Sequence, residues 1–247
     1  MNKLPYKIIT TSWDDGHRAD LKLAKILTDH QLPATFYMSP QNRELTPADR
    51  LTSEQIQQIA TQHEIGAHTL THPVLNKIPL DEAKAEIEGS RMYLKQLTGQ
   101  SIDMFCYPRG AYNRPVRDIV EAAGYIGART IQPSQTRPPQ DYYQLGTTKH
   151  AYPVHVNYAL RLALLHNPRF FMNVTSRNWL TVAAKTFDYV NDHGGIWHLW
   201  GHSWELEDQN LWSDFELLCR QVANRPGFTY LTNSQLVAFL RQQQGRA

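Results

Sequence analysis

The chain has 247 residues, of which 41% are apolar and 19% are charged, and its formal net charge is +2 at pH 7. This length and apolar content suffice for one large hydrophobic core, so we expect a single domain over residues 1–247. Positive and negative charges are nearly balanced and form no long runs, so we expect neither a nucleic acid nor an anionic membrane as partner.

Strand and helix patterns alternate through the first half of the chain. The spacing of apolar residues predicts strands over residues 8–13, 34–38, 64–67, 102–107 and 125–130. It predicts helices over residues 19–30, 52–62, 80–97 and 115–123, the second capped by Thr52 or Ser53 and the fourth with Pro115 in its first turn. This alternation is typical of consecutive βα units.

The second half is less regular, because residues 133–178 fit no clean unit and are expected to form loops plus one helix over 156–165. Beyond them, helices are predicted over residues 180–193 and 211–224 and from Asn233 onward, with strands over 196–200 and 228–230. Six or seven such βα units predict an α/β fold with a parallel sheet closed into a barrel.

Four polar clusters follow predicted strands, at the edge where parallel α/β folds place their functional groups. They are Asp14-Asp15-Gly16-His17, His68-Thr-Leu-Thr-His72, Tyr107-Pro-Arg-Gly110 and His198-Leu-Trp-Gly-His202. Each alone has an ordinary structural reading, such as a charge pair at a helix N-terminus or solvated loop histidines. Their recurrence at one edge favours a shared site.

Two of these clusters predict a metal centre. His68 and His72 are four residues apart, so on a helical turn both rings project from one face and reach one cation. Asp14 and Asp15 repel each other, and a divalent cation held by one of them relieves that repulsion and leaves the other free as a base.

The sequence resembles the polysaccharide deacetylases, carbohydrate esterase family 4, from residue 8 to about residue 204. The resemblance rests on Ser12-Trp-Asp-Asp-Gly16, His68-Thr-Leu-Thr-His72, Phe105-Cys-Tyr-Pro-Arg-Gly110 and Leu199-Trp-Gly-His202. It implies a distorted, seven-stranded (β/α) barrel. It also implies a metal-dependent hydrolase that removes an acetyl or similar acyl group from an N-acylated sugar.

The resemblance also implies residue roles. Asp14 corresponds to the general base, and Asp15, His68 and His72 to the ligands of a divalent metal, Zn²⁺ or alternatively Co²⁺, Ni²⁺ or Mn²⁺. His202 is the candidate for the acid that protonates the leaving nitrogen, with His198 as the alternative.

Three positions depart from the family pattern. Cys106 stands where the family has an arginine that touches the base, so an arginine contact to Asp14 must come from elsewhere or be absent. Arg109 stands at the position where the family has a tyrosine, and the backbone amide of that position binds the oxyanion. The side chain of Arg109 either turns inward to Asp14 or, as we favour, outward toward a substrate phosphate. Asn178 replaces an aspartate in the counterpart of the fourth motif, residues 175–179.

The remaining expectations concern substrate, location and alternatives. Tyr107, Arg109 and Trp200 are expected to contact substrate or its oxyanion. Most of the rings of Trp197, Trp200, Trp204 and Trp212 are expected in the core, with one or two lining a cleft. Glu205 and Glu207 are expected on a solvated face, with binding of sugar hydroxyls as the alternative.

The first residues contain no apolar leader, and no stretch approaches 18 uninterrupted apolar residues, so we expect a cytoplasmic protein without a membrane span. A nucleotide-linked or lipid-linked N-acetyl sugar fits this location better than chitin. Cys106 and Cys219 are expected to be buried thiols. The alternatives are an amidohydrolase acting on a non-sugar C–N bond and an inactive carbohydrate-binding relative.

Overall fold

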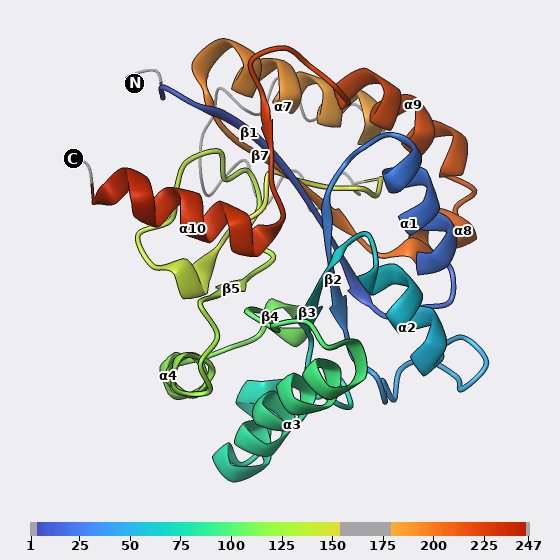
Figure 1. The fold of residues 1–247 in the computed structure, drawn as a ribbon, viewed down its shortest axis with the longest axis vertical. Coiled ribbons are helices and arrows are strands. Elements are labelled where there is room, and N and C mark those ends of the chain that lie inside the picture. The colour runs from blue at the N-terminus through green and yellow to red at the C-terminus, as the bar shows by residue number, and fades with distance from the viewer. Residues whose placement is uncertain (1–3, 154–178, 246–247) are drawn as a thin grey trace.

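The computed structural model describes residues 4–153 and 179–245, and Figure 1 shows a parallel sheet surrounded by helices. The strands are β1 (Lys7–Asp15), β2 (Ala34–Met38), β3 (Glu64–Ala67), β4 (Met104–Cys106), β5 (Gly127–Arg129), β6 (Lys149–His150), β7 (Gly195–Gly201) and β8 (Thr229–Tyr230). The α-helices are α1 (Asp20–Asp29), α2 (Ser53–Ala60), α3 (Leu80–Thr98), α4 (Arg114–Ala122), α7 (Trp179–His193), α8 (Ser203–Asp208), α9 (Trp212–Val222) and α10 (Asn233–Gln244). Short 3₁₀ turns are η1 (Leu75–Lys77), η2 (Pro108–Gly110) and η3 (Tyr142–Gln144).

Seven strands follow one another in the order β5-β4-β3-β2-β1-β7-β6, and the short β8 pairs with β1 off this path. All the paired strands run parallel, as βα units require. A bridge between Arg129 and Leu145 links β5 to the segment that leads into β6. The sheet therefore curls into the distorted (β/α) barrel that the sequence predicts, within one domain.

The central strand β1 has the catalytic candidates at its carboxyl-terminal end. It pairs with β7 over residues 7–13 and with β2 over residues 11–15, and all its residues except Lys7 are buried. Such continuous burial is typical of a parallel strand covered on both faces. The strand runs two residues beyond its predicted end, so Asp14 and Asp15 lie within it.

Helix ends agree with their sequence signals. Thr52 caps α2 through a capping box with Gln55, and α3 ends where Gly99 takes the left-handed conformation, with φ of 70°.

At the opposite end of the barrel from β1's carboxylates, α10 packs Leu236, Val237 and Leu240 against Ile8 and other inward residues of the strands. This plug leaves the carboxyl-terminal end of the strands as the place for a site.

The stretch over residues 133–178 was expected to hold only loops and one helix, but β6 lies within it, because a two-residue strand is too short to show a period. The helix predicted over 156–165, and residues 175–178 of the fourth-motif counterpart, lie outside the described residues.

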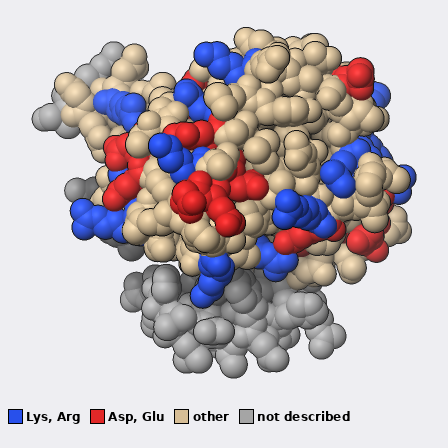
Figure 2. Space-filling view, turned by 90° about the horizontal axis from the view of Figure 1, so that it is seen from below, with Lys and Arg blue, Asp and Glu red and all other residues tan. Residues whose placement is uncertain are grey.

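The surface agrees with the balanced composition. On the face seen in Figure 2, acidic and basic side chains are interspersed, with acidic atoms gathered near its centre. Across the described part of the chain, no helix combines the length and apolar character needed to cross a bilayer.

Candidate active site

The loop after β3 presents the two histidines of the HxxxH motif. It is not the helical turn that the spacing suggested: Thr69 and His72 have φ of 66° and 65°, which breaks any helix. Glu86 of α3 holds the loop, because one of its carboxylate oxygens accepts from the backbone N–H groups of Leu70 (2.8 Å) and Thr71 (2.9 Å). A long-range contact, rather than helical spacing, thus aims the two rings.

Three donor atoms converge between this loop and β1. The Nε2 atoms of His68 and His72 are 3.2 Å apart, and Asp15 Oδ1 lies 3.7 Å from the first and 3.4 Å from the second. A tetrahedral Zn²⁺ site with bonds of about 2.0–2.2 Å places its donor atoms about 3.3–3.6 Å apart. The spacing of the three atoms fits one cation.

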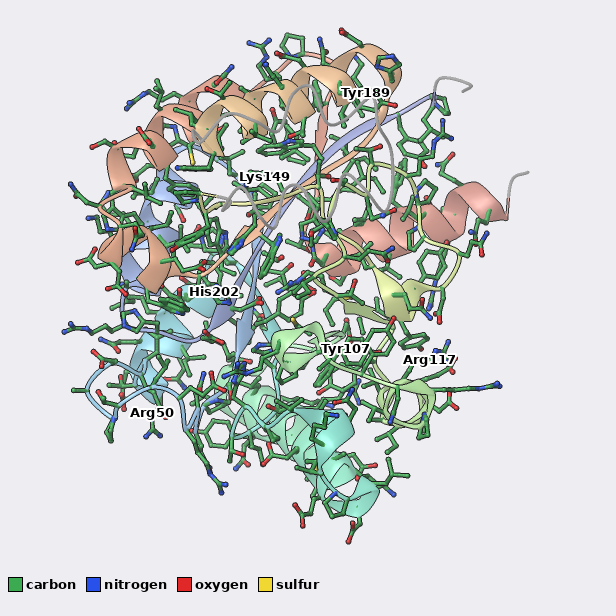
Figure 3. The ribbon with its side chains drawn as sticks, turned by 180° about the vertical axis from the view of Figure 1, so that it is seen from behind. Arg50, Tyr107, Arg117, Lys149, Tyr189 and His202 are labelled. Atoms are coloured by element: carbon green, nitrogen blue, oxygen red, sulfur yellow. The ribbon has the colours of Figure 1, made fainter. Side chains whose placement is uncertain are left out.

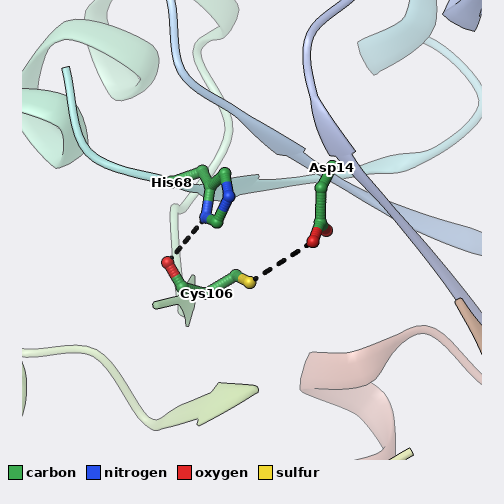
Figure 4. Close-up of side chains that lie close together, drawn as sticks. All are labelled: Asp14, His68 and Cys106. Atoms are coloured by element: carbon green, nitrogen blue, oxygen red, sulfur yellow. Dashed lines mark hydrogen bonds between the residues drawn. The ribbon is translucent and has the colours of Figure 1, made fainter. Parts of the chain in front are cut away.

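The other ring nitrogen of each histidine, Nδ1, faces an oxygen atom. His68 Nδ1 lies 2.7 Å from the Cys106 carbonyl, as Figure 4 shows, and His72 Nδ1 lies 3.2 Å from Glu44 Oε1. His68 Nδ1 therefore donates, which leaves the lone pair of this ring on Nε2, whereas His72 Nδ1 is buried and its geometry makes no hydrogen bond. Asp15 Oδ1 is buried and has no hydrogen-bond partner. A buried carboxylate oxygen without a partner, close to two imidazole nitrogens, is the kind of donor group that can hold a metal ion.

Asp14 lies within 4.8 Å of one of these donors, His68, but its carboxylate has other partners. A buried ion pair joins its Oδ1 to Arg129 Nη2 on β5, and its Oδ2 accepts a weak hydrogen bond from Cys106 Sγ at 3.7 Å (Figure 4). Burial opposes ionisation, but the positive charge of Arg129, with His68 and His202 nearby, outweighs it and lowers the pKa of Asp14 to about 2. Asp14 is therefore an ionised carboxylate at neutral pH.

His202, labelled in Figure 3, directly follows β7 and lies close to the donor Asp15. Its Nε2 lies 3.9 Å from Asp15 Oδ2, and its Nδ1 lies 2.8 Å from Glu205 Oε2. The same Glu205 oxygen accepts from His150 Nε2 at 2.7 Å. Burial works against the imidazolium, but Glu205 and the two aspartates raise the pKa of His202 to about 9. Glu205 is buried, so the expected solvated face was wrong for this residue.

The alternative acid, His198, has a different environment. Its Nε2 lies 2.8 Å from Ser12 Oγ, and the side chain is fully buried in the barrel. Burial lowers the pKa of His198 to about 3, so this ring is neutral at physiological pH. A neutral, enclosed ring is poorly placed to deliver a proton to a leaving group.

The tryptophans mostly belong to the core, as expected. Trp197, Trp200 and Trp212 are buried, and Trp200 stacks on His150 at 4.2 Å with Arg129 over its ring at 4.8 Å. Its faces are therefore occupied, which leaves little of Trp200 for a sugar. Trp204 is half-buried and donates its Nε1–H to Asp15 Oδ2 at 2.9 Å, so it is the indole at the donor set.

Tyr107 contributes packing rather than a free donor. Its backbone N–H donates to the Arg129 carbonyl at 3.3 Å, and its hydroxyl donates to the Tyr143 carbonyl at 3.1 Å. The ring is fully buried and stacks on Tyr112. The expected oxyanion contact of Tyr107 is therefore not available from either group.

Arg109 points outward. Its Nη2 and Nε lie 2.7 and 3.2 Å from Glu44 Oε1, the oxygen that also contacts His72. The Arg109 side chain is 60% exposed, and Asp14 already has Arg129 as its partner. The inward alternative is thus wrong, and the guanidinium lies at the rim of the donor set.

Residues 2–128, about half of the chain, match the profile of the family described as Polysaccharide deacetylase. The chain belongs to the polysaccharide deacetylase family. A relative from Geobacillus stearothermophilus, an uncharacterized 30.6 kDa protein, is 26% identical over 121 residues, which are 49% of this chain and 43% of that protein. The chain thus matches less than half of this curated relative's length.

Solved structures extend the likeness to the fold. The Streptococcus pyogenes deacetylase PplD, in complex with acetate, is 22% identical and has a TM-score of 0.50, covering 59% of this chain and 66% of that one. A Mycobacterium smegmatis protein assigned to the polysaccharide deacetylases is 14% identical and has a TM-score of 0.71, covering 99% of this chain and 95% of that one. The chain therefore shares its barrel fold with these two structures.

The sequence analysis missed several residues of the candidate active site. Arg129 could have been noticed as a lone charge in an apolar strand pattern. Glu205 was assigned to solvent, although a residue three positions after His202 on a helical turn can reach it. Glu44 and Glu86 carry no local signal, because their partners lie far away in the sequence.

Proposed function

We propose that this chain is a metal-dependent deacetylase that removes an acetyl group from an N-acetylated sugar. The observation that carries the proposal is the convergence of Asp15 Oδ1, His68 Nε2 and His72 Nε2 beside an ionised Asp14. Three nitrogen and oxygen donors suit Zn²⁺ or a related divalent cation and leave coordination positions open. When bound, such a cation supplies a Lewis acid for the acyl carbonyl and lowers the pKa of a water.

The chain's own residues divide the proton transfers. Asp14, ionised beside Arg129, accepts the proton of the water that attacks the acetyl carbon. His202, whose pKa is raised to about 9, is protonated at neutral pH and donates its proton to the leaving sugar nitrogen. The backbone N–H of Arg109 corresponds to the family's oxyanion donor.

Acetate release tests this proposal directly. The purified protein, loaded with Zn²⁺, should release acetate from at least one member of a panel of free, nucleotide-linked and lipid-linked N-acetyl sugars, and a chelator should abolish the release. Release of ammonia or an amine from non-sugar amides alone would instead support the amidohydrolase alternative. Sugar binding without turnover by any metal-loaded sample would support the inactive relative.

Glu205 is expected to control the basic side of the pH profile. Replacing Glu205 with glutamine removes the charge and the acceptor that raise the pKa of His202, while burial of the imidazolium remains. The pKa of His202 then falls, so the basic limb of kcat/KM should move to lower pH by at least about one unit. Activity at pH 8 falls more than activity at pH 6.

A matched control lies on the same short helix. Glu207 is exposed, so Glu207→Gln makes the same chemical change without touching His202. Its pH profile should overlay that of the wild type. An unmoved basic limb in Glu205→Gln would remove Glu205 from the acid's environment.

The substrate class proposed is an N-acetyl sugar that carries a phosphate. What supports it is the exposed guanidinium of Arg109 at the rim, since arginine suits bidentate contact with phosphate. Arg109→Ala should weaken turnover of phosphorylated substrates by roughly 1.5–3 kcal/mol, the size of a charged hydrogen bond, and leave unphosphorylated ones unchanged. The acidic limb of kcat/KM should not move, because Asp14 is paired with Arg129.

Arg114 provides the comparison for this charge effect. It is 92% exposed, and Arg114→Ala removes the same charge from a different part of the surface. Equal losses with both substrate types for Arg109→Ala, or an equal loss for Arg114→Ala, would contradict a specific phosphate contact.

A further inference from the structure

Arg129 and Cys106 occupy paired positions of neighbouring strands. In the register of β4 and β5, the Cα of Cys106 is the partner of the Cα of Arg129. Residues paired across parallel strands project to the same face of a sheet, and Cys106 packs among the inward-facing residues of the barrel. Both side chains therefore start from adjacent points on the inner wall, across the barrel from β1.

The Arg129 side chain crosses the barrel between two aromatic rings and out of contact with solvent. Its guanidinium carbon lies 5.2 Å from the ring centre of Tyr37 on β2 and 4.8 Å from that of Trp200 on β7. Its side chain is 0% exposed. Aromatic faces stabilise a desolvated guanidinium, and the small Cys106 leaves room beside its end, where the thiol meets the other oxygen of Asp14 at 3.7 Å.

We infer that Arg129 is the positioning residue of the base, and that β5 has taken over this task from the β4 position where Cys106 now stands. Arg129 fixes Asp14 through Oδ1, so that Oδ2, whose contact is the weak donor Cys106 Sγ, keeps one orientation beside His68. Cys106 is small because two arginines at these paired positions would compete for one carboxylate. The inference rests on the proposed function, since it assigns a partner to the proposed base.

The first variant is Arg129→Met, a buried side chain of similar length without charge. Each sample is loaded with Zn²⁺, and its folded fraction, metal content, kcat and KM for acetate release are measured. We expect kcat per folded, metal-loaded molecule to fall about 10²-fold, as for a misplaced catalytic group. KM should change less than threefold, because the buried Arg129 cannot touch substrate.

Arg91→Met is the matched control for loss of a structural arginine. Arg91 donates to the carbonyls of Ile102, Ala123 and Gly124 at 2.9 to 3.0 Å, away from the site. Its loss should lower Tm but leave kcat per folded molecule within about twofold of wild type, because none of the three carbonyls belongs to a residue that contacts Asp14.

The decisive variant returns the arginine to β4. Cys106→Arg combined with Arg129→Cys keeps the composition of the paired positions and moves the charge by one strand. It should recover at least tenfold of the kcat lost in Arg129→Met, and it should also recover Tm, which is read without any substrate. A folded, metal-loaded double variant as slow as Arg129→Met would overturn the inference.

A second test holds even if Arg129→Met alone does not fold. Asp14→Asn is compared with Asp14→Asn combined with Arg129→Met, which removes both members of the ion pair. If Arg129 acts only through Asp14, the second change costs no further rate. A further tenfold loss would show that Arg129 acts elsewhere.

The activity of the wild type distinguishes a failure of the proposed function from a failure of the role assigned to Arg129. Absence of acetate release from every sugar by the metal-loaded wild type contradicts the proposed function. An active wild type with Arg129→Met within threefold of it contradicts only the role of Arg129.

Discussion

Replacing His72 with alanine is expected to remove bound metal and deacetylation together. His72 Nε2 lies between His68 Nε2 at 3.2 Å and Asp15 Oδ1 at 3.4 Å, so its loss leaves two donors where three converge. Loss of an outer hydrogen-bond partner already costs about 10–100-fold in metal affinity, and loss of a ligand costs more. Elemental analysis of the purified variant after dialysis against a metal-free buffer measures the effect, and His68→Ala and Asp15→Asn should behave alike.

His193 provides the control for this experiment. It is exposed on α7, where its Nδ1 contacts the carbonyl of Tyr189 at 2.9 Å, so His193→Ala should keep both metal and activity. A His72→Ala protein that stays fully loaded would mean that the metal is held by other residues. Metal loss without loss of acetate release would instead contradict metal dependence.

Asp14→Asn is expected to keep the metal and lose the reaction. An amide cannot accept the proton of the attacking water, so kcat should fall at least about 10²-fold, the usual contribution of a general base. The donor set of Asp15, His68 and His72 is untouched, and the metal content should equal that of the wild type. Acetate release measured per metal-loaded molecule checks the prediction.

The same substitution also has a cost in stability. Arg129 loses the carboxylate that balances its fully buried charge, and breaking one side of a buried ion pair destabilises a protein by about 3–5 kcal/mol. The free energy of unfolding of Asp14→Asn should therefore fall by that amount, and rates must be normalised to the folded fraction. Near-wild-type turnover of the folded fraction would show that another group is the base.

Residues close in the sequence were the ones whose arrangement could be predicted. The Asp14-Asp15 pair and the HxxxH spacing follow predicted strands, and parallel strands end at one edge, so proximity of these groups follows from the alternation of βα units. The departure at Cys106 was visible as well. It showed that a partner of Asp14 was missing from its usual place without showing where the replacement stands.

The tertiary structure alone decided which distant residues complete the site. Arg129 reaches Asp14 because the sheet curls and brings β5 across the barrel from β1, a closure that no local pattern encodes. Glu86 holds the HxxxH loop from 16 residues away, and His150 meets Glu205 from 55 residues away, separations that local periodicity and propensity do not reach. The amino-acid order thus determined the strands, their parallel arrangement and the edge that bears the polar clusters, because these depend on local periodicity and chain connectivity. The partners of the buried charges depend on how the barrel closes, since a charge without water must be balanced by whatever group the fold places within a few ångströms.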